Sequence, residues 1–332
     1  MIQYLCVERF ADFTINKALS SGILPRDRVT FLSYEQMFHE RQVPAGTYVF
    51  TDFDRLTRYE LECASEAWRI LQRHSGMGLM LNAPHRVLER VALLQALHRA
   101  RINNYGVWRI GDGILPDRYP VFIRSEDDCA GPETDLIPNE YALMHTIALL
   151  QERGTPLRGR IAVEYCAERH MDGYFRKYGA FKIGKTILPH HVHFSPHWIV
   201  KAANARRDAV NDDPGKISLP SHEREELDYV MENPHHRELE TIFQIASIDF
   251  GRIDYSIVGG RIQVYEINTN PTLPSAGRPG AAPHRQITRE RFKAAFLALE
   301  PYPLPQSALI PIDLAKPQRQ DMRAPRANGI TT

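Results

Sequence analysis

The sequence has few cysteines, and they are arranged in no recognisable pattern. Among 332 residues only four are cysteine, and they stand singly at Cys6, Cys63, Cys129 and Cys166, with no Cys-x-x-Cys spacing. A secreted disulfide scaffold or a cysteine-based zinc site is therefore not expected. Reduced thiols are the simplest interpretation.

Long hydrophobic runs are missing as well. No stretch approaches about 18 uncharged apolar residues, the length that a membrane-spanning helix needs. The first apolar run is interrupted by Glu8 and Arg9 and is too short for a signal peptide. We therefore expect a protein that stays in the cytoplasm and has no membrane partner.

Neither sign of charge dominates the chain. The 41 Lys and Arg residues balance 40 Asp and Glu residues, which leaves a formal charge of +1. Non-specific binding to nucleic acid relies on a basic field, so no nucleic-acid partner is expected. A serine-hydrolase elbow, a Walker phosphate loop and a Gly-x-Gly-x-x-Gly motif are also absent, which excludes the enzyme classes that depend on them.

The first hundred residues alternate β-branched or aromatic runs with helical patterns. This rhythm predicts a small parallel α/β domain over residues 1–100. The expected strands are 2–7, 28–32, 47–51 and 78–81. A helix is expected over 57–73, and a second one is expected to begin at Pro84, with Asn82 as its cap.

After this domain the sequence pattern changes to one that predicts strands, hairpins and isolated helices. The spacing predicts helices over 140–151 and 223–231 and a hairpin over 179–188 that turns at Gly184-Lys185. Residues 101–300 are expected to form the second part of the protein. Residues 301–332 are rich in proline and arginine, without apolar periodicity, and are predicted to be a disordered or loosely docked tail.

The most informative stretch predicts two strands, 251–258 and 261–267, joined by the glycines at 259 and 260. Along the second strand, Glu266 and Asn268 lie two positions apart and so share one face. A two-residue turn alone would set Asp254 opposite Tyr265. A longer loop or a bulge would instead pair Asp254 with Glu266, with their Cβ atoms about 5 Å apart.

This carboxylate pair points to a metal ion. Two carboxylates at that distance repel each other unless a cation lies between them. Oxygen ligands from Asp254, Glu266 and Asn268 suit Mg²⁺, which binds through one or two carboxylates and substrate phosphates. The prediction is therefore a divalent metal ion together with a nucleotide; the alternative is a solvent-facing hairpin.

At this point the sequence resembles the ATP-grasp superfamily, which includes D-alanyl-D-alanine ligase, glutathione synthetase and ribosomal glutamate-adding ligases. The closing motif of the superfamily runs Arg-x-Asp, a hairpin, and Glu-x-Asn-x-x-Pro. Here it stands as Arg252-Ile-Asp254 and Glu266-Ile-Asn268-Thr-Asn-Pro271. The resemblance implies a small parallel α/β domain followed by a two-lobed ATP-grasp fold with a lid at roughly 119–190.

The resemblance also implies roles for these residues. Asp254, Glu266 and Asn268 would hold Mg²⁺, with Mn²⁺ as an alternative. Arg252 would contact the transferred phosphoryl group or an acyl phosphate, which a guanidinium can stabilise. The alternative for Arg252 is a plain ion pair with Asp254.

An ATP site should then precede the hairpin. The strand 119–124 looks like the superfamily's phosphate strand, with Arg124 in place of the usual lysine. The loop 125–136 occupies the position of a glycine-rich phosphate-covering loop, yet it contains only Gly131 and is acidic. This departure puts the usual contacts between loop and phosphate in doubt.

The strand 160–166 is similar to the hinge that receives adenine. By resemblance, Glu164, Tyr165 and Cys166 would line that position; the alternative for Glu164 is an exposed strand end. Glu168 or Asp172 would reach the ribose.

The basic stretch 174–182 lies where relatives carry a phosphate-binding residue. Its candidates are Arg176, Lys177 and Lys182, and Lys201 is a more distant one. The alternative is a solvated basic hairpin.

Two further polar groups are open to a functional or a structural reading. Asp52 and Asp54 follow the third strand, where ligands bind in open parallel sheets, although Asp54 or Thr57 could simply cap the next helix. The run 188–197 holds four histidines without a second set of metal ligands nearby. We interpret these histidines as structural rather than as a zinc site.

The expected function is that of an ATP-dependent ligase. It would join a small-molecule or peptide carboxylate to an amine or thiol through an acyl phosphate. The alternatives are a kinase that phosphorylates a hydroxyl group, and a non-catalytic nucleotide-binding module. The identity of the acceptor and the oligomeric state stay open; a homodimer is compatible with the sequence.

Overall fold

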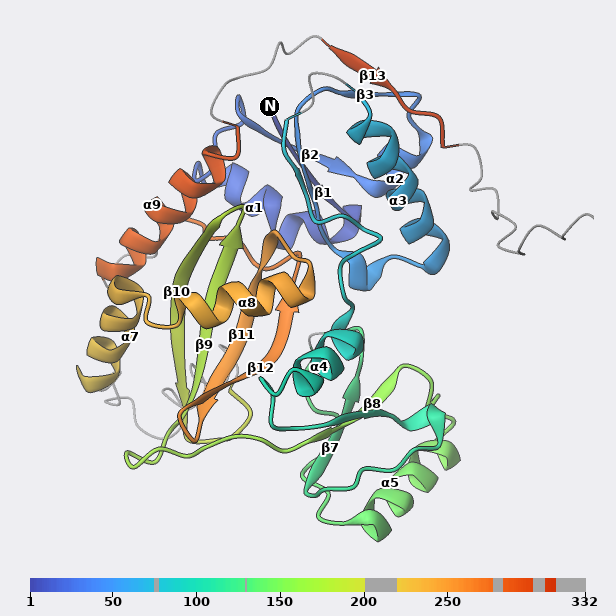
Figure 1. The fold of residues 1–332 in the computed structure, drawn as a ribbon, viewed down its shortest axis with the longest axis vertical. Coiled ribbons are helices and arrows are strands. Elements are labelled where there is room, and N and C mark those ends of the chain that lie inside the picture. Colours follow the sequence, from blue (N-terminus) through green and yellow to red (C-terminus); the bar gives the residue numbers. More distant parts are fainter. Residues whose placement is uncertain (75–77, 129, 201–219, 277–282, 301–307, 315–332) are drawn as a thin grey trace, which may run out of the picture.

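The computed structural model describes residues 1–74, 78–128, 130–200, 220–276, 283–300 and 308–314. Cys129 and Lys201 lie outside these ranges, as does most of the predicted tail. Figure 1 shows a small N-terminal domain, a separate three-stranded lobe, and a four-stranded sheet with helices packed on it. The predicted succession of a parallel α/β domain and two α+β lobes is therefore confirmed.

The N-terminal domain is a parallel sheet, as the sequence predicts. Its strand order is β2-β1-β4-β5, and both faces carry buried apolar residues. The strands are β1 (Ile2–Cys6), β2 (Val29–Ser33), β4 (Thr47–Phe50) and β5 (Met80–Leu81). The helices are α1 (Ile15–Ser20), α2 (Tyr34–His39) and α3 (Arg58–Gln72), with short 3₁₀ turns at Glu8–Phe13 and Phe53–Arg55.

Helix α3 begins where its cap places it. The Thr57 side chain accepts a hydrogen bond from Glu60 N, and the Glu60 side chain accepts one from Thr57 N, which satisfies two backbone donors. The following helix differs from the prediction, because α4 spans Arg90–Arg99 and does not begin at Pro84. Asn82 is not a cap: it has φ of 62°, and its side chain binds Phe50 O and Phe250 O.

The three-stranded lobe has the antiparallel order β6-β8-β7. Its strands are β6 (Val107–Arg109), β7 (Val121–Ser125) and β8 (Arg160–Glu164), and a 3₁₀ turn covers Ile110–Asp112. Helix α5 (Glu140–Glu152), capped by Asn139, covers one face of this sheet, where the predicted helix 140–151 was placed.

The larger sheet is antiparallel, in the order β10-β9-β11-β12. Its strands are β9 (Phe175–Ile183), β10 (Thr186–Ser195), β11 (Phe250–Val258) and β12 (Arg261–Asn268). The predicted turns at 184–185 and 259–260 are confirmed, but the first hairpin is longer than the predicted 179–188. Helix α7 (Pro220–Glu232) contains the predicted helix, whereas α8 (His236–Ala246) and α9 (Pro283–Leu297) were not predicted.

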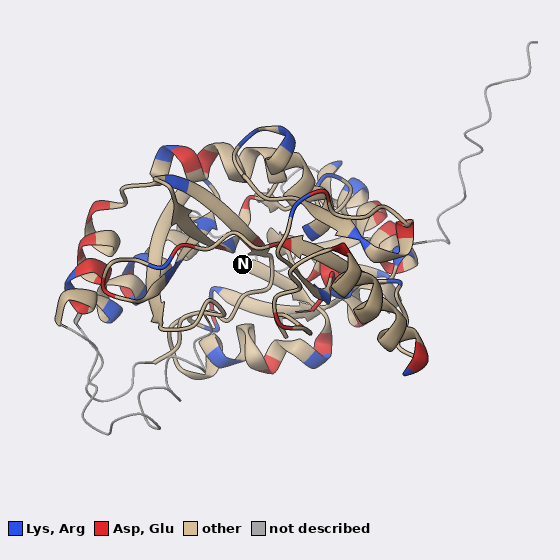
Figure 2. Cartoon of the chain, turned by 90° about the horizontal axis from the view of Figure 1, so that it is seen from below, with Lys and Arg blue, Asp and Glu red and all other residues tan. Residues whose placement is uncertain are grey.

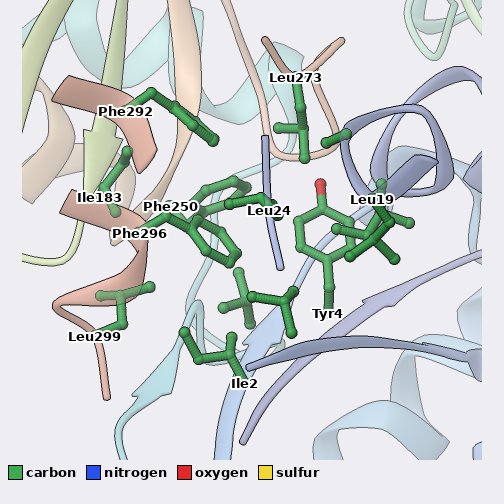
Figure 3. Packing of buried hydrophobic residues seen from close by; sticks show 14 of the residues in the cluster. Ile2, Tyr4, Leu19, Leu24, Ile183, Phe250, Leu273, Phe292, Phe296 and Leu299 are labelled. Carbon is green, nitrogen blue, oxygen red and sulfur yellow. The ribbon is translucent and has the colours of Figure 1, made fainter. Parts of the chain in front are cut away.

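The two faces of this sheet are packed differently. Helix α8 lies across one face, where Ile253, Tyr255 and Val264 are fully buried. On the other face, Phe250 meets α9 and the N-terminal domain, and Figure 3 shows Tyr4 beside Phe250 and Phe296 in this shared core. The N-terminal domain is thus fixed against one end of the sheet, next to the closing motif.

Part of the predicted disordered tail is ordered. Strand β13 (Leu309–Pro311) pairs with β3 (Gln42–Pro44), and Ile310 is buried in the N-terminal core. This short strand corresponds to the docked alternative for the tail, and the sequence could not locate it because three residues are too few to show an apolar period. Residues 301–307 and 315–332 lie outside the described ranges.

Acidic and basic residues alternate along the chain, in keeping with the near-zero net charge (Figure 2). Within the described ranges, no helix has both the length and the apolar character needed to span a membrane.

Candidate functional site

One row of paired residues crosses the whole four-stranded sheet. His191 on β10 pairs with Gly179 on β9, Gly179 pairs with Asp254 on β11, and Asp254 pairs with Glu266 on β12. Directly paired residues in an antiparallel sheet project to the same face. The two carboxylates therefore point to one side of the sheet.

The hairpin combines both geometries that the sequence left open. Val258 pairs with Arg261, so the turn has two residues, and a bulge between Asp254 and Tyr255 then restores the direct pairing of Asp254 with Glu266. Tyr265 is the extra residue of the bulge, and its hydroxyl contacts Ser256. The bulge is therefore the feature that brings the carboxylates together.

Asp254 is buried, being 3% exposed, between two basic side chains. Lys177 Nζ lies 2.9 Å from Asp254 Oδ2, and Arg252 Nε lies 3.0 Å from Asp254 Oδ1. Burial alone would raise the pKa of Asp254, but Arg252 and Lys177 outweigh it and hold the pKa well below its usual range. Asp254 is thus a carboxylate anion at neutral pH.

Glu266 is held by two arginines from other parts of the fold. Arg90 Nη2, on α4, donates to Glu266 Oε2 at 2.8 Å, and Arg124 Nη2, on β7, lies 3.7 Å from the same oxygen. Arg90 is 8% exposed. Sequence reasoning missed Arg90, because no local pattern links a helix start to a strand 176 positions away.

Arg252 and Asn268, which complete the motif, face each other across the two strands. Arg252 makes the ion pair with Asp254 that was its alternative role. Its contact with a phosphoryl group stays a prediction. Asn268 Oδ1 accepts a hydrogen bond from Asn270 N at 2.8 Å. Asn270 in turn accepts one from the Tyr4 hydroxyl, so the motif is tied to the N-terminal domain.

A cavity of about 1060 Å³, its open mouth included, lies between the two lobes. Nine of the predicted site residues line it: Arg124, Glu164, Tyr165, Cys166, Glu168, Arg176, Lys177, Asp254 and Glu266. Arg252, Asn268, Asp172 and Lys182 do not.

The phosphate-strand residue Arg124 is largely buried at the cavity wall. Its Nη2 donates to Asp128 O at 2.9 Å and its Nε to Ser125 O at 3.2 Å, both in the loop that follows. Burial and the neighbouring Arg90 lower the pKa of Arg124. The arginine that replaces the usual lysine therefore binds the backbone of its own loop.

At the hinge, the predicted residues contact protein groups as well as the cavity. Glu164 Oε2 accepts from Gly106 N at 2.8 Å and pairs with Arg118 at 2.9 Å. Tyr165 N donates to Pro120 O. Burial raises the pKa of the Cys166 thiol to about 11, so this residue is no nucleophile at neutral pH.

The basic stretch divides between the two faces of β9. Lys177 shares the face of Asp254, whereas Lys182, an odd number of positions away, lies on the opposite face and is 7% exposed. Lys177, which the sequence could not rank above Lys182, is therefore the lysine at the cavity. Lys182 is placed away from it.

Asp172 and Arg176 pair with each other at 2.6 Å. Arg176 also binds Glu225, and His222 Nε2 lies 3.0 Å from Asp172. The hydrogen bond from Arg176 holds the pKa of Asp172 well below its usual range. Of the two ribose candidates, Glu168 lines the cavity and Asp172 does not.

An aromatic wall of the cavity was not predicted. Trp198 lies against Phe122, with ring centroids 5.1 Å apart, and edge-on to Tyr165 at 5.7 Å. Leu94 and Val163 complete the apolar part of the lining. Trp198 was not among the residues that the sequence singled out.

Most of the histidine run belongs to β10, the edge strand of the sheet that carries Asp254. The His191 and His193 rings stack with centroids 3.9 Å apart, and a Cβ at Gly179 would come within 2.4 Å of His191 Cε1. His191 therefore occupies the space that a side chain at position 179 would fill. Burial lowers the pKa of His193 to about 3, so its imidazole is neutral at pH 7.

Asp52 and Asp54 occupy different environments at the end of β4. Asp52 is 1% exposed, pairs with Arg55 and accepts from Val7 N, so it anchors the N-terminal domain. Burial raises the pKa of Asp54 to about 6, with Arg90 acting against this shift. Neither residue lines the cavity between the lobes.

The oxygen ligands at this end of the row of paired residues suit a hard cation. Asp254 and Glu266 supply carboxylate oxygens on one face, and Asn268, two positions from Glu266, shares that face. No group of three or more His, Cys, Asp or Glu in the part of the chain that the structure describes is arranged to hold a metal ion. Two carboxylates and one amide with substrate phosphates remain compatible with Mg²⁺.

No family model matches this sequence, and no curated protein matches it. Among solved structures, a D-alanine–D-alanine ligase from Bacillus anthracis complexed with ATP is similar to it, with 10% identity over 90% of this chain and 94% of that one and a TM-score of 0.49. An L-amino acid ligase from Bacillus licheniformis has 11% identity over 91% and 77% of the two chains, with a TM-score of 0.44.

A RimK domain protein ATP-grasp from Sphaerobacter thermophilus has 13% identity over 90% of this chain and 98% of that one, with a TM-score of 0.45. All three TM-scores lie below 0.5, so these similarities carry no conclusion about function.

Proposed function

We propose that this chain, whose sheets follow in the order implied by its resemblance to ATP-grasp proteins, is an ATP-dependent ligase. The observation that carries the proposal is the pair Asp254 and Glu266. They lie side by side on one sheet face, at the wall of a cavity, with a basic partner for each carboxylate. This arrangement suits a metal–nucleotide complex better than a solvent-facing hairpin, because Asp254 is almost completely buried.

The cavity offers an apolar end and a charged end. Phe122, Tyr165 and Trp198 form an aromatic wall at which an adenine base would stack, since aromatic rings favour such contacts. Asp254, Glu266 and Arg124 lie at the charged part of the lining, where phosphates would be bound. ATP fits this division of a single cavity.

Asp254, Glu266 and Asn268 would hold Mg²⁺, which neutralises phosphate charge when it is bound. Arg252 and Lys177 flank Asp254 and would orient the phosphates and stabilise charge that develops during transfer. A substrate carboxylate oxygen would attack the γ-phosphorus of ATP, and the bond to the ADP oxygen would break. The resulting acyl phosphate would be attacked by an amine or thiol, with loss of inorganic phosphate and a proton.

A screen for magnesium-dependent ADP release over amino acids, short peptides and sugar acids tests this function. The expected result is ADP release with at least one carboxylate, and formation of a hydroxamate when hydroxylamine replaces the natural nucleophile. A hydroxylamine-insensitive phosphate ester would instead identify a kinase. ATP binding without ADP release for any acceptor would favour a nucleotide-binding module.

A further inference from the structure

A compact cluster joins Glu266 to the loop 125–128. Arg90 Nη1 donates to Glu126 O at 2.7 Å and to Asp128 O at 2.8 Å, while its Nη2 donates to Glu266 Oε2 at 2.8 Å. Arg124 Nη2 reaches Asp128 O as well, and it lies 3.7 Å from the same Glu266 oxygen. One guanidinium thus binds the loop and the carboxylate at the same time.

The loop is a tight connection rather than an extended flap. After β7, Glu133 N donates to Ile123 O, and Arg124 bridges to Pro132, so the chain doubles back on itself. Gly131, the single glycine of the loop, has φ of 93°, which the turn requires. With one glycine and several acidic side chains, the loop depends on other residues to keep its shape.

The acidic side chains of the loop are not what Arg90 binds. Arg90 binds main-chain carbonyl groups, and the Glu126 side chain pairs instead with Arg109 at 2.7 Å. An arginine fork can serve several acceptors in fixed directions, which a lysine ammonium cannot. The guanidinium of the buried Arg90 serves three such acceptors, at 2.7–2.8 Å.

We infer that Arg90 is a positioning residue that orients Glu266 for a divalent cation and fixes the loop 125–128 next to Glu266, so that cation binding and loop position are linked. By holding Oε2, Arg90 directs the other carboxylate oxygen of Glu266 to a ligand. Partners of this kind orient metal-binding carboxylates and change metal affinity by about 10- to 100-fold when removed. The cation half of this inference rests on the proposed function; the loop half does not.

This linkage accounts for the two departures from the ATP-grasp pattern. Arg124, the glycine-poor loop and Arg90 form one network of contacts beside Glu266. The loop then acts on the nucleotide site through Glu266, by way of Arg90.

The test compares Arg90→Gln with Arg109→Gln as a matched control. Both changes remove an arginine that binds Glu126, but only Arg90 also contacts Glu266. Arg90→Lys, which keeps the charge and most of the side-chain volume, serves as a second variant in case Arg90→Gln does not fold. Two readouts are needed: amide hydrogen exchange of residues 125–128 in the nucleotide-free protein, and the Mg²⁺ concentration for half-maximal ATP binding.

We expect Arg90→Gln to speed exchange of the loop amides by at least about tenfold and to raise the half-saturating Mg²⁺ concentration by about 10- to 100-fold. Arg109→Gln should leave the Mg²⁺ requirement unchanged, and Arg90→Lys should fall between wild type and Arg90→Gln.

Unchanged exchange and unchanged Mg²⁺ dependence in Arg90→Gln would overturn the inference. Equal effects of Arg90→Gln and Arg109→Gln on both readouts would also overturn it, because loss of positive charge near the loop would then suffice. If the wild-type protein binds no Mg-ATP, the cation half fails together with the proposed function. Hydrogen exchange still decides the loop half in that case.

Discussion

The two lobes that line the cavity use charged side chains in different ways. On the four-stranded sheet, Asp254 pairs with the side chains of Lys177 and Arg252. On the three-stranded lobe, Arg124 and Glu164 bind backbone groups of neighbouring segments, Asp128 O and Gly106 N. A side-chain partner can turn to a ligand, whereas a backbone partner fixes the shape of the lobe.

The difference suggests a division of labour. Substitutions on the four-stranded sheet should mainly change the binding of ATP, the binding of the metal ion and the pairing of buried charges. Changes on the three-stranded lobe should act mainly on local structure. The following predictions test this division, from the largest expected effect to the smallest.

Glu266→Gln should reduce ADP release by at least about 100-fold, because a neutral amide binds a divalent cation weakly. It also supplies no negative charge to offset the charge of Mg²⁺ bound to the phosphates. Glu168→Gln is the matched control: Glu168 lines the same cavity but is exposed, and among the described residues it accepts a backbone hydrogen bond from Gly259. The rate of ADP release by Glu168→Gln should fall by less than about tenfold. Steady-state ADP release measures both, and equal losses would contradict the division.

Asp254→Asn should lower the free energy of unfolding by about 3 kcal/mol, because it leaves two largely buried cations without their anion. The double variant Asp254→Asn with Lys177→Met should recover part of this loss, since one unpaired charge is removed. Urea denaturation of the wild type, the two single variants and the double variant gives the coupling free energy of the pair in a double-mutant cycle. A double variant that is less stable than Asp254→Asn would show that the ion pair with Lys177 is not the cause.

The histidines of β10 should make the protein sensitive to mild acid. Burial lowers the pKa values of His190 and His193 to about 3, so the folded state keeps them neutral while the unfolded state takes up protons below about pH 6.5. Stability should therefore fall as the pH drops from 6.5 to 4.5. Asp254, whose pKa is lowered on folding, adds to this loss only below about pH 4.

His193→Asn should reduce the slope of unfolding free energy against pH in this window by up to about 1.4 kcal/mol per pH unit. Urea denaturation at four pH values between 7.5 and 4.5 measures the slope. The same slope in the variant and the wild type would mean that His193 is not kept neutral by the fold.

Glu164→Ala should have the smallest effect. Gly106 N loses its acceptor, which costs about 1 kcal/mol, and the lost pair with the half-exposed Arg118 adds little. The affinity for ATP should change by less than about tenfold. A loss of ATP binding as large as that of Glu266→Gln would place a nucleotide contact on Glu164 and blur the contrast between the lobes.

Much of the hairpin could be predicted from local pattern. Two glycines between β-rich runs predicted the turn, and the period of two predicted the shared face of Glu266 and Asn268. The bulge at Asp254 could only be offered as an alternative, because a bulge depends on cross-strand hydrogen bonds that the sequence does not display. The structure decides this point.

Other parts of the site depend on register and on long-range packing. Lys177 and Lys182 could not be ranked without knowing which face of β9 each residue occupies. Arg90 and Trp198 come from α4 and from the segment after β10. Only the folded chain brings Arg90 to Glu266 and Trp198 to the cavity. Asn82 resembled a helix cap because its long-range partners, Phe50 and Phe250, were hidden from local reasoning.

The most direct test of the central proposal is calorimetric titration of ATP into the wild-type protein, with Mg²⁺ and with the metal chelated, repeated for Glu266→Gln. We predict that Mg²⁺ tightens ATP binding by at least about tenfold in the wild type and by little in the variant. Binding of equal strength with and without the metal, or the same gain in the variant, would contradict a divalent site at Asp254 and Glu266.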